Sequence, residues 1–207
     1  MENKTFIFDN VEITHINHAS FRIKYDDLVI YIDPYQVKDE PADYILITHD
    51  HFDHFDPNSI ELLKTPQTVF IVPEIMADKF TGNVHSLLPE ESFGDGKISV
   101  YTIPMHNMHH PKQKDFLAFI LEVDKKRIFH AGDSGPTDEM KMLLNIDVAL
   151  MPIDGKYTMN EAEAADMVKE FKPKVVIPMH YGEIPGGGDP ELFRRLVNGN
   201  AQVEILE

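Results

Sequence analysis

The sequence predicts an α/β (α+β) fold, whose mixture of elements could give two sheets packed face to face with helices on the outside. Three observations support this prediction. The chain has 207 residues, a length that suits one hydrophobic core, so we expect residues 1–207 to form a single domain. Its first segments are short and strand-like with no helix between them. Later segments alternate between strand and helix patterns, which is typical of βα units.

The opening segments indicate antiparallel sheet. Residues 11–16, 21–25 and 28–32 have strand-like patterns, and polar turns such as Asp26-Asp27 separate them. Residues 44–48 form a short apolar run, which predicts a buried strand. This strand leads directly into a segment rich in histidine.

The rest of the chain predicts alternating elements. Asp56 and Pro57 are suited to the N-cap and first position of a helix, and Asn160 with Glu163 forms the sequence pattern of a capping box. The predicted helices are 57–64, 73–80, 137–144, 160–171 and 190–197. The predicted strands are 68–72, 97–103, 116–123, 127–130, 148–151, 175–179 and 203–206.

Composition narrows the classes of function. The net charge of −16 repels phosphate backbones, so we expect no nucleic-acid partner. No apolar run approaches the length that spans a bilayer, so we expect no membrane association. The absence of cysteine excludes disulfides and thiolate ligands. Residues 1–5 carry no basic segment followed by an apolar one, and together these features predict a cytoplasmic protein.

The segment His49-Asp50-His51-Phe52-Asp53-His54 predicts a metal site. His49 and His51 stand two residues apart at the end of a strand and therefore project to the same side. A turn before Asp56-Pro57 lets Asp53 and His54 face a second cation. The alternative is a polar surface loop, but so many histidines and aspartates in six residues are rare by composition.

A dinuclear site needs further ligands, and three later strand ends offer them. His106, Asp133 and His180 each follow an apolar strand. A carboxylate such as Asp133 can bridge two cations. His109 and His110 compete with His106 for the same role.

The order His-x-His-x-Asp-His, followed by His106, Asp133 and His180, resembles the metallo-β-lactamase superfamily over nearly the whole chain. The resemblance implies an αββα sandwich with a two-metal site at one edge of the sheets. It implies that one metal is held by His49, His51 and His106, that the other is held by Asp53, His54 and His180, and that Asp133 bridges them.

Four segments are similar to one branch of that superfamily, which contains ascorbate-phosphate lactonase. They are Asn17-His18-Ala19-Ser20-Phe21, Ile32-Asp33-Pro34, 130–135 (HAGDSG) and 178–182 (PMHYG). Asn17 stands where the resemblance predicts a glycine before His18. This leaves open whether a tight turn forms there. His51 stands where the superfamily's flavodiiron oxygen reductases carry glutamate, so the resemblance favours hydrolysis over redox chemistry.

These features predict a dinuclear metal-dependent hydrolase. A metal-bound hydroxide would attack an ester, lactone or phosphodiester of a small-molecule substrate, and Asp53 would accept the proton. We expect two divalent ions, Zn first, with Mn or Fe as alternatives because His and Asp ligands discriminate weakly.

Other side chains are candidates for supporting roles. Lys156 could pair with a substrate anion or be an ordinary surface lysine. Tyr181, next to His180, could donate to an oxyanion or only pack over the site. His18 and His130 could orient metal-bound carboxylates or be satisfied core histidines.

Two other functions compete with the small-metabolite hydrolase. One is a phosphodiesterase acting on a lipid or nucleotide. The other is a non-catalytic metal-binding protein, which predicts lost ligands. The sequence leaves a homo-oligomer open.

Overall fold

The computed structural model describes residues 4–182 and 187–206. The chain divides into two compact units, the first made of Met1–Leu88 with Leu206–Glu207 and the second of Pro89–Ile205. Each unit contains one seven-stranded sheet.

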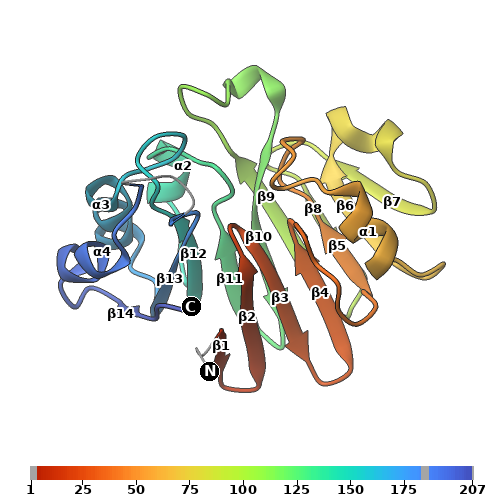
Figure 1. Cartoon of the computed structure of the whole chain (residues 1–207), viewed down its shortest axis with the longest axis horizontal. Helices are drawn as coiled ribbons and strands as arrows, with labels where there is room; N and C mark the ends of the chain where they lie inside the picture. Colours follow the sequence, from red (N-terminus) through yellow and green to blue (C-terminus); the bar gives the residue numbers. More distant parts are fainter. Residues whose placement is uncertain (1–3, 183–186, 207) are drawn as a thin grey trace. The chain divides into compact units, whose positions relative to one another are not determined.

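The sheet of the first unit follows the chain in order from β1 to β7 and is drawn red to yellow in Figure 1. Its strands are β1 (Thr5–Phe8), β2 (Val11–Asn17), β3 (Ser20–Tyr25), β4 (Leu28–Ile32), β5 (Tyr44–Leu46), β6 (Val69–Pro73) and β7 (Asn83–Leu87). The pairs from β1 to β4 are antiparallel, and those from β4 to β7 are parallel. The predicted antiparallel opening is confirmed.

Helix α1 (Pro57–Leu63) buries its apolar side on this sheet. Its Ile60 and Leu63 belong to one hydrophobic cluster with Tyr31, Ile45 and Phe70, which come from β4, β5 and β6. The Asp56 side chain accepts a hydrogen bond from the first turn, as the sequence predicts. The helix therefore fixes the end of the connection that follows β5, where the histidine-rich segment lies.

The sheet of the second unit runs in the order β14-β13-β12-β11-β10-β9-β8. Its strands are β8 (Ser92–Gly94), β9 (Ser99–Pro104), β10 (Leu117–Val123), β11 (Lys126–His130), β12 (Val148–Pro152), β13 (Val175–Met179) and β14 (Gln202–Val203). The pairs from β8 to β11 are antiparallel, and those from β11 to β14 are parallel. This sheet is also mixed, and its parallel half matches the predicted alternation of strands and helices.

Three α-helices accompany this sheet: α2 (Asp138–Lys141), α3 (Glu161–Phe171) and α4 (Pro190–Val197). The capping box predicted for α3 is present, since Asn160 accepts from the Glu163 amide and the Glu163 carboxylate accepts from the Asn160 amide. Phe171 at the end of α3 meets Phe129 of β11 edge to face, with ring centroids 5.9 Å apart. Figure 1 shows α3 and α4 side by side, in agreement with their extensive contacts.

Some elements differ from the sequence predictions. The strands β1, β7 and β8 were not predicted, and each is short with few fully buried residues. Pairing with a neighbouring strand stabilises such segments, and pairing leaves no clear mark on the pattern of apolar residues. The helix predicted over 73–80 is a 3₁₀ helix, η1 (Glu74–Lys79), and the one predicted over 137–144 is reduced to α2.

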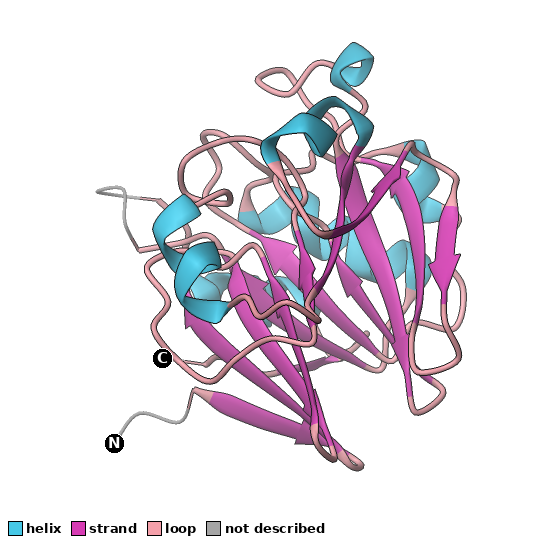
Figure 2. Ribbon diagram, turned by 90° about the vertical axis from the view of Figure 1, so that its right-hand side faces the viewer, coloured by secondary structure: helices cyan, strands magenta, loops and turns pink. Residues whose placement is uncertain are grey.

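Two mixed β-sheets flanked by helices confirm the predicted fold class. Figure 2 shows how much of the regular structure is strand, drawn in magenta, compared with the short helices in cyan. Among the described residues, no helix has the length and apolar character that crossing a membrane requires.

Candidate metal centre

The predicted ligands follow the ends of strands in both units. In the first unit, β5 ends at Leu46 and the segment from His49 to His54 follows it. In the second unit, the candidates come after β9, β11 and β13. Residues just beyond a strand end lie in loops, where the backbone is not part of the sheet. Such positions suit binding groups.

Three residues that directly follow strands β2, β4 and β13 have left-handed backbone conformations. His18, Asp33 and His180 have φ values of 49°, 47° and 55°. Non-glycine residues with positive φ are uncommon and concentrate at functional sites. The turn between β2 and β3 does form although Asn17 replaces the expected glycine, because His18 takes the left-handed position.

In the first unit, Asp33 and Thr48 contact the Nδ1 atoms of His54 and His49. The Asp33 carboxylate accepts from the Thr48 amide at 2.7 Å and from the Thr48 hydroxyl at 2.5 Å. Nδ1 of His54 lies 2.7 Å from the same carboxylate, and Nδ1 of His49 lies 2.9 Å from the Thr48 hydroxyl. All four residues are fully buried.

These contacts set the tautomers of both histidines. A carboxylate only accepts, so Nδ1 of His54 carries the proton that it donates to Asp33. The Thr48 hydroxyl gives its own proton to Asp33 and therefore accepts from Nδ1 of His49. Each ring then presents the Nε2 lone pair, which is the form of imidazole that binds a metal.

The other residues of the motif differ in environment. Asp53 lies 3.2 Å from Nε2 of the buried His18, so His18 contacts a predicted ligand carboxylate, as the sequence suggests. The ring of His51 is 4.6 Å from that of His49, measured between centroids. Asp50, by contrast, is exposed and pairs with Lys79 at 3.3 Å. The structure thus separates Asp50 from the candidate ligands.

In the second unit, Asp133 lies between two histidines. Its Oδ1 is 3.3 Å from Nε2 of His180, and its Oδ2 is 3.5 Å from Nε2 of His110. All three side chains are at most 4% exposed. A buried carboxylate between two imidazole nitrogens has the arrangement expected of a metal-bridging ligand.

His106 has different surroundings from His110. Its Nε2 is 3.8 Å from Glu139, and its side chain is 27% exposed. Asn107 holds the connection between the two histidines, because its side-chain oxygen accepts from the backbone amides of His109 and His110. Within this unit, Asp133 therefore contacts His110, which the sequence offered as an alternative, whereas His106 faces Glu139.

Asp154 is a functional candidate that sequence reasoning missed. Its Oδ2 lies 3.3 Å from Nδ1 of His180, and its Oδ1 accepts from the amides of Lys156, Tyr157 and Thr158. Burial alone would raise the pKa of Asp154, but the contacts with His180 and these amides hold that pKa well below its ordinary value. Asp154 is thus an ionised carboxylate that orients His180. Its position just after the buried strand β12 was the available signal.

The remaining candidates lie in the second unit too. Lys156 places its ammonium 4.7 Å from the centre of the Tyr157 ring. Tyr181 is half-buried beside Gly188, which has a φ of 52°; a Cβ on Gly188 would lie 2.6 Å from that of Tyr181. His130 is buried and accepts from the Gly132 amide, so it supports the turn that leads to Asp133.

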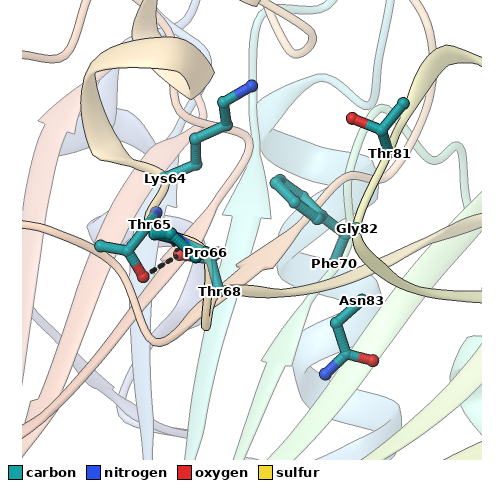
Figure 3. Close-up of a pocket in the computed structure, with 8 residues that line it drawn as sticks. All are labelled: Lys64, Thr65, Pro66, Thr68, Phe70, Thr81, Gly82 and Asn83. Carbon is teal, nitrogen blue, oxygen red and sulfur yellow. Dashed lines mark hydrogen bonds between the residues drawn. The ribbon is translucent and has the colours of Figure 1, made fainter.

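A cavity in the first unit lies away from this motif. Figure 3 shows its lining, with Lys64 and Thr65 from the connection after α1, and Thr81 and Asn83 near the start of β7. It sits at the amino ends of β6 and β7, whereas the histidine-rich segment follows the carboxyl end of β5. None of the predicted ligands lines it.

The donors suit a divalent first-row metal. Each unit combines buried imidazole Nε2 atoms with a carboxylate, and other groups hold the far side of His49, His54 and His180. Nitrogen and carboxylate ligands with a supporting shell are typical of zinc, manganese and iron sites. The fold and these donors define a metal-dependent enzyme of the metallo-β-lactamase class.

The comparisons with known proteins identify the family. Residues 12–180 match the β-lactamase superfamily domain. A UPF0173 protein of Pyrococcus abyssi is 34% identical over 197 residues, covering 89% of this chain and 90% of the relative. A UPF0173 metal-dependent hydrolase of Lysinibacillus sphaericus is 30% identical, covering 95% of this chain and 96% of the relative. The chain belongs to the metallo-β-lactamase superfamily, in the UPF0173 group of metal-dependent hydrolases.

Solved structures agree with this assignment. A crystal structure from Parabacteroides distasonis superposes with a TM-score of 0.86 at 30% identity, covering 100% of this chain and 98% of the other. A metallo hydrolase from Ignicoccus hospitalis superposes with a TM-score of 0.80 at 25% identity, covering 95% of each chain. The sequence prediction of a metal-dependent hydrolase of this superfamily is therefore confirmed at the level of family and fold.

Proposed function

We propose that this protein hydrolyses an ester, lactone or phosphodiester of a small metabolite at a dinuclear metal site, with residues 1–207 acting as one domain. The proposed ligands are His49, His51, Asp53 and His54 from the first unit and His110, Asp133 and His180 from the second. His110 takes the place first offered to His106, because His110 contacts Asp133 while His106 faces Glu139.

One observation carries the proposal: the paired support of His49 and His54 by Thr48 and Asp33. A buried carboxylate that fixes the tautomer of one histidine directly, and of another through a hydroxyl, is a costly arrangement in a protein interior. It is accounted for if both Nε2 atoms bind metal, because such outer contacts orient ligands and raise their basicity.

Two divalent ions bound by these groups would supply an activated water near neutral pH and positive charge opposite a developing oxyanion. The chain's own groups would do the rest. Asp53 would accept the proton of the attacking water, with His18 at 3.2 Å to hold that carboxylate in place. Asp154 would keep Nε2 of His180 directed toward Asp133. Tyr181 would donate a hydrogen bond to the oxyanion.

The finer parts of the proposal rest on sequence. Zinc is the first choice of metal, with manganese or iron as alternatives, because the ligand types suit all three. The branch that contains ascorbate-phosphate lactonase is proposed from the motifs around His18, Asp33, Asp133 and His180. A cytoplasmic location is proposed from the lack of cysteine in the sequence.

The test is to measure metal content and turnover in the same preparation. Protein reconstituted with zinc, manganese or iron would be analysed for metal per chain and assayed on lactone, carboxylic ester, phosphodiester and β-lactam substrates. The expected result is two metals per chain and turnover of at least one class. Fewer than two metals per chain, together with no turnover of any class, would sink the proposal.

Asp53→Asn and Asp50→Asn make a matched pair for this test. Both remove one carboxylate from the same loop, but Asp53 contacts His18 whereas Asp50 is exposed and pairs with Lys79. Asp53→Asn is expected to lower kcat by a factor on the order of 10²–10⁴, the range for loss of a general base, while Asp50→Asn stays near wild type. Equal losses in the two variants would contradict the role given to Asp53.

A further inference from the structure

The second unit contains a cavity of about 350 Å³ whose lining includes Lys156, Tyr157, His106, His109, Asn107 and Glu163. The cavity lies among three connections: the one after β9, the one after Asp133 and the one after Asp154. The first carries His110, and the other two adjoin Asp133 and Asp154. A ligand in this cavity would therefore lie beside the residues assigned to the metal centre within the same unit.

Lys156 lines this cavity and differs from the lysines of the same unit that pair with carboxylates. Lys112, Lys141, Lys169 and Lys174 each pair with a carboxylate at 2.6–2.8 Å. Lys156 makes no such ion pair among the described residues, and its ammonium instead lies 4.7 Å from the centre of the Tyr157 ring. A cation–π contact holds an ammonium group in position without cancelling its charge. The Lys156 ammonium is therefore a positive charge held in place at the cavity wall, in a chain whose net charge is −16.

The acidic member of the lining is already engaged. The Glu163 carboxylate accepts from the Asn160 amide at 3.0 Å as part of the capping box of α3. His109 also contacts Tyr157, with ring centroids 5.4 Å apart, and adds a ring N–H donor whatever its tautomer. The lining thus offers a ligand one cation and hydrogen-bond donors, beside one carboxylate that is held at the start of α3.

Asn107 holds the walls of the cavity together. Its amide nitrogen donates to the carbonyls of Asp133 at 2.6 Å and Tyr157 at 2.7 Å, and its oxygen accepts from the His109 amide. Gly135 permits this close packing, since a Cβ there would lie 3.0 Å from that of Asn107. The walls are therefore fixed before a ligand arrives, which reduces the entropy lost on binding.

We propose that this cavity binds an anionic group of the substrate, a phosphate or a carboxylate, and that Lys156 is the residue that selects for it. A single ammonium with hydrogen-bond donors beside it matches one oxyanion. The inference rests on the proposed hydrolase function only in taking the anion to be part of a substrate.

Binding is tested first on the full chain after removal of metal by a chelator, so that anions cannot bind to metal. Inorganic phosphate and acetate, titrated by calorimetry at low ionic strength, distinguish the two sources of the anion. Lys156→Met is expected to weaken binding of the preferred anion on the order of tenfold or more, as loss of a charge-assisted hydrogen bond does. Lys156→Arg should retain binding within a few-fold. Lys97→Met, which removes an exposed lysine of the same unit, should leave it unchanged.

Turnover is tested second, with metal-loaded protein and two esters that differ only in one anionic group. Lys156→Met should raise KM for the anionic ester and leave both constants for the neutral ester unchanged. Turnover that does not depend on Lys156, or equal anion binding by wild type and Lys156→Met, overturns the inference. Anion binding that depends on Lys156 in a protein that hydrolyses neither ester supports this site and counts against the hydrolase function alone.

Discussion

The Asp33 carboxylate lies 2.7 Å from Nδ1 of His54, and both side chains are fully buried. The same carboxylate accepts from the amide and hydroxyl of Thr48. Three donors thus surround one buried carboxylate, and the contact with Nδ1 fixes how the ring of His54 is turned. Asp33 follows β4 and His54 follows β5, and the parallel pairing of these strands brings the two residues together.

Asp33→Asn should weaken metal binding by about 10–100-fold, the usual effect of losing such a supporting contact. The amide that replaces one carboxylate oxygen presents N–H groups to neighbours that are themselves donors, so at least one of those donors loses its acceptor. Apo-protein stability should also fall, by about 1–3 kcal/mol. Competition with a chromophoric chelator gives the affinity, and urea unfolding gives the stability.

Asp43→Asn is the control for this change. Asp43 is also an aspartate of the first unit with a backbone partner, since it accepts from the Val29 amide at 2.9 Å. It precedes β5 rather than following it, so its loss should affect stability but not metal affinity. Similar losses of metal affinity in both variants would show that Asp33 acts only through folding.

Thr48→Val tests the indirect support of His49. Valine has nearly the shape of threonine but cannot pass a hydrogen bond between Asp33 and Nδ1 of His49, which are joined through the Thr48 hydroxyl. We expect weaker metal binding in Thr48→Val, with most of the affinity retained in Thr48→Ser, which keeps the hydroxyl. The same chelator competition measures both. If serine is as defective as valine, the hydroxyl is not the group that matters.

His110→Ala and His106→Ala distinguish the two candidates for the third histidine ligand. His110 is buried and contacts Asp133, whereas His106 is partly exposed and faces Glu139. We therefore expect His110→Ala to lose one metal per chain, or to bind it at least tenfold more weakly, and His106→Ala to keep both. Metal analysis after equilibrium dialysis measures this. Retention of both metals by His110→Ala, with loss in His106→Ala, would restore the first assignment.

Sequence reasoning was most successful where a feature depends on residues that are close together in the sequence. The residue types and spacing from His49 to His54 indicate a metal site. The spacing of Asn160 and Glu163 indicates the start of α3 in the same way. The pattern of the opening strands predicted antiparallel sheet and the later alternation predicted βα units, while the arrangement as two mixed sheets came from the family resemblance. These signals lie within a few residues of one another, so one sequence is enough to see them.

The roles of Asp33, Thr48 and Asp154 could not be derived from the residues in this way. Asp33 and Asp154 act on histidines that strand pairing or chain reversal brings near, such as Asp33 on His54, 21 residues away. Thr48 is adjacent to His49, but its role depends on the distant Asp33 that accepts its proton. The choice between His106 and His110 has the same cause. Both follow β9, and only the fold of the connection held by Asn107 directs His110 toward Asp133.

His15 gives the protein a predictable loss of stability in mild acid. Burial lowers the pKa of His15 below its ordinary value of 6.5, and the charges of Lys4 and His18 act in the same direction. Contacts of the ring with the carbonyls of His18 and Leu206 act in the opposite direction but do not prevail. In the folded protein, His15 is therefore neutral at a pH where the unfolded chain has already bound the proton.

The sign of the effect follows from linkage. Between the lowered pKa and 6.5, the unfolded chain holds more protons at this site than the folded protein does, so acid favours unfolding. The contribution of neutral His15 is complete above pH 6.5 and is lost as the pH falls below that value. His15→Gln removes this titration, so its stability should fall less than that of wild type between pH 7.5 and pH 5.5. Urea unfolding of both proteins with a chelator present measures the difference, while the comparison at pH 7.5 alone gives the structural cost of the substitution. Parallel losses in the two proteins over this range would mean that His15 does not contribute to acid sensitivity.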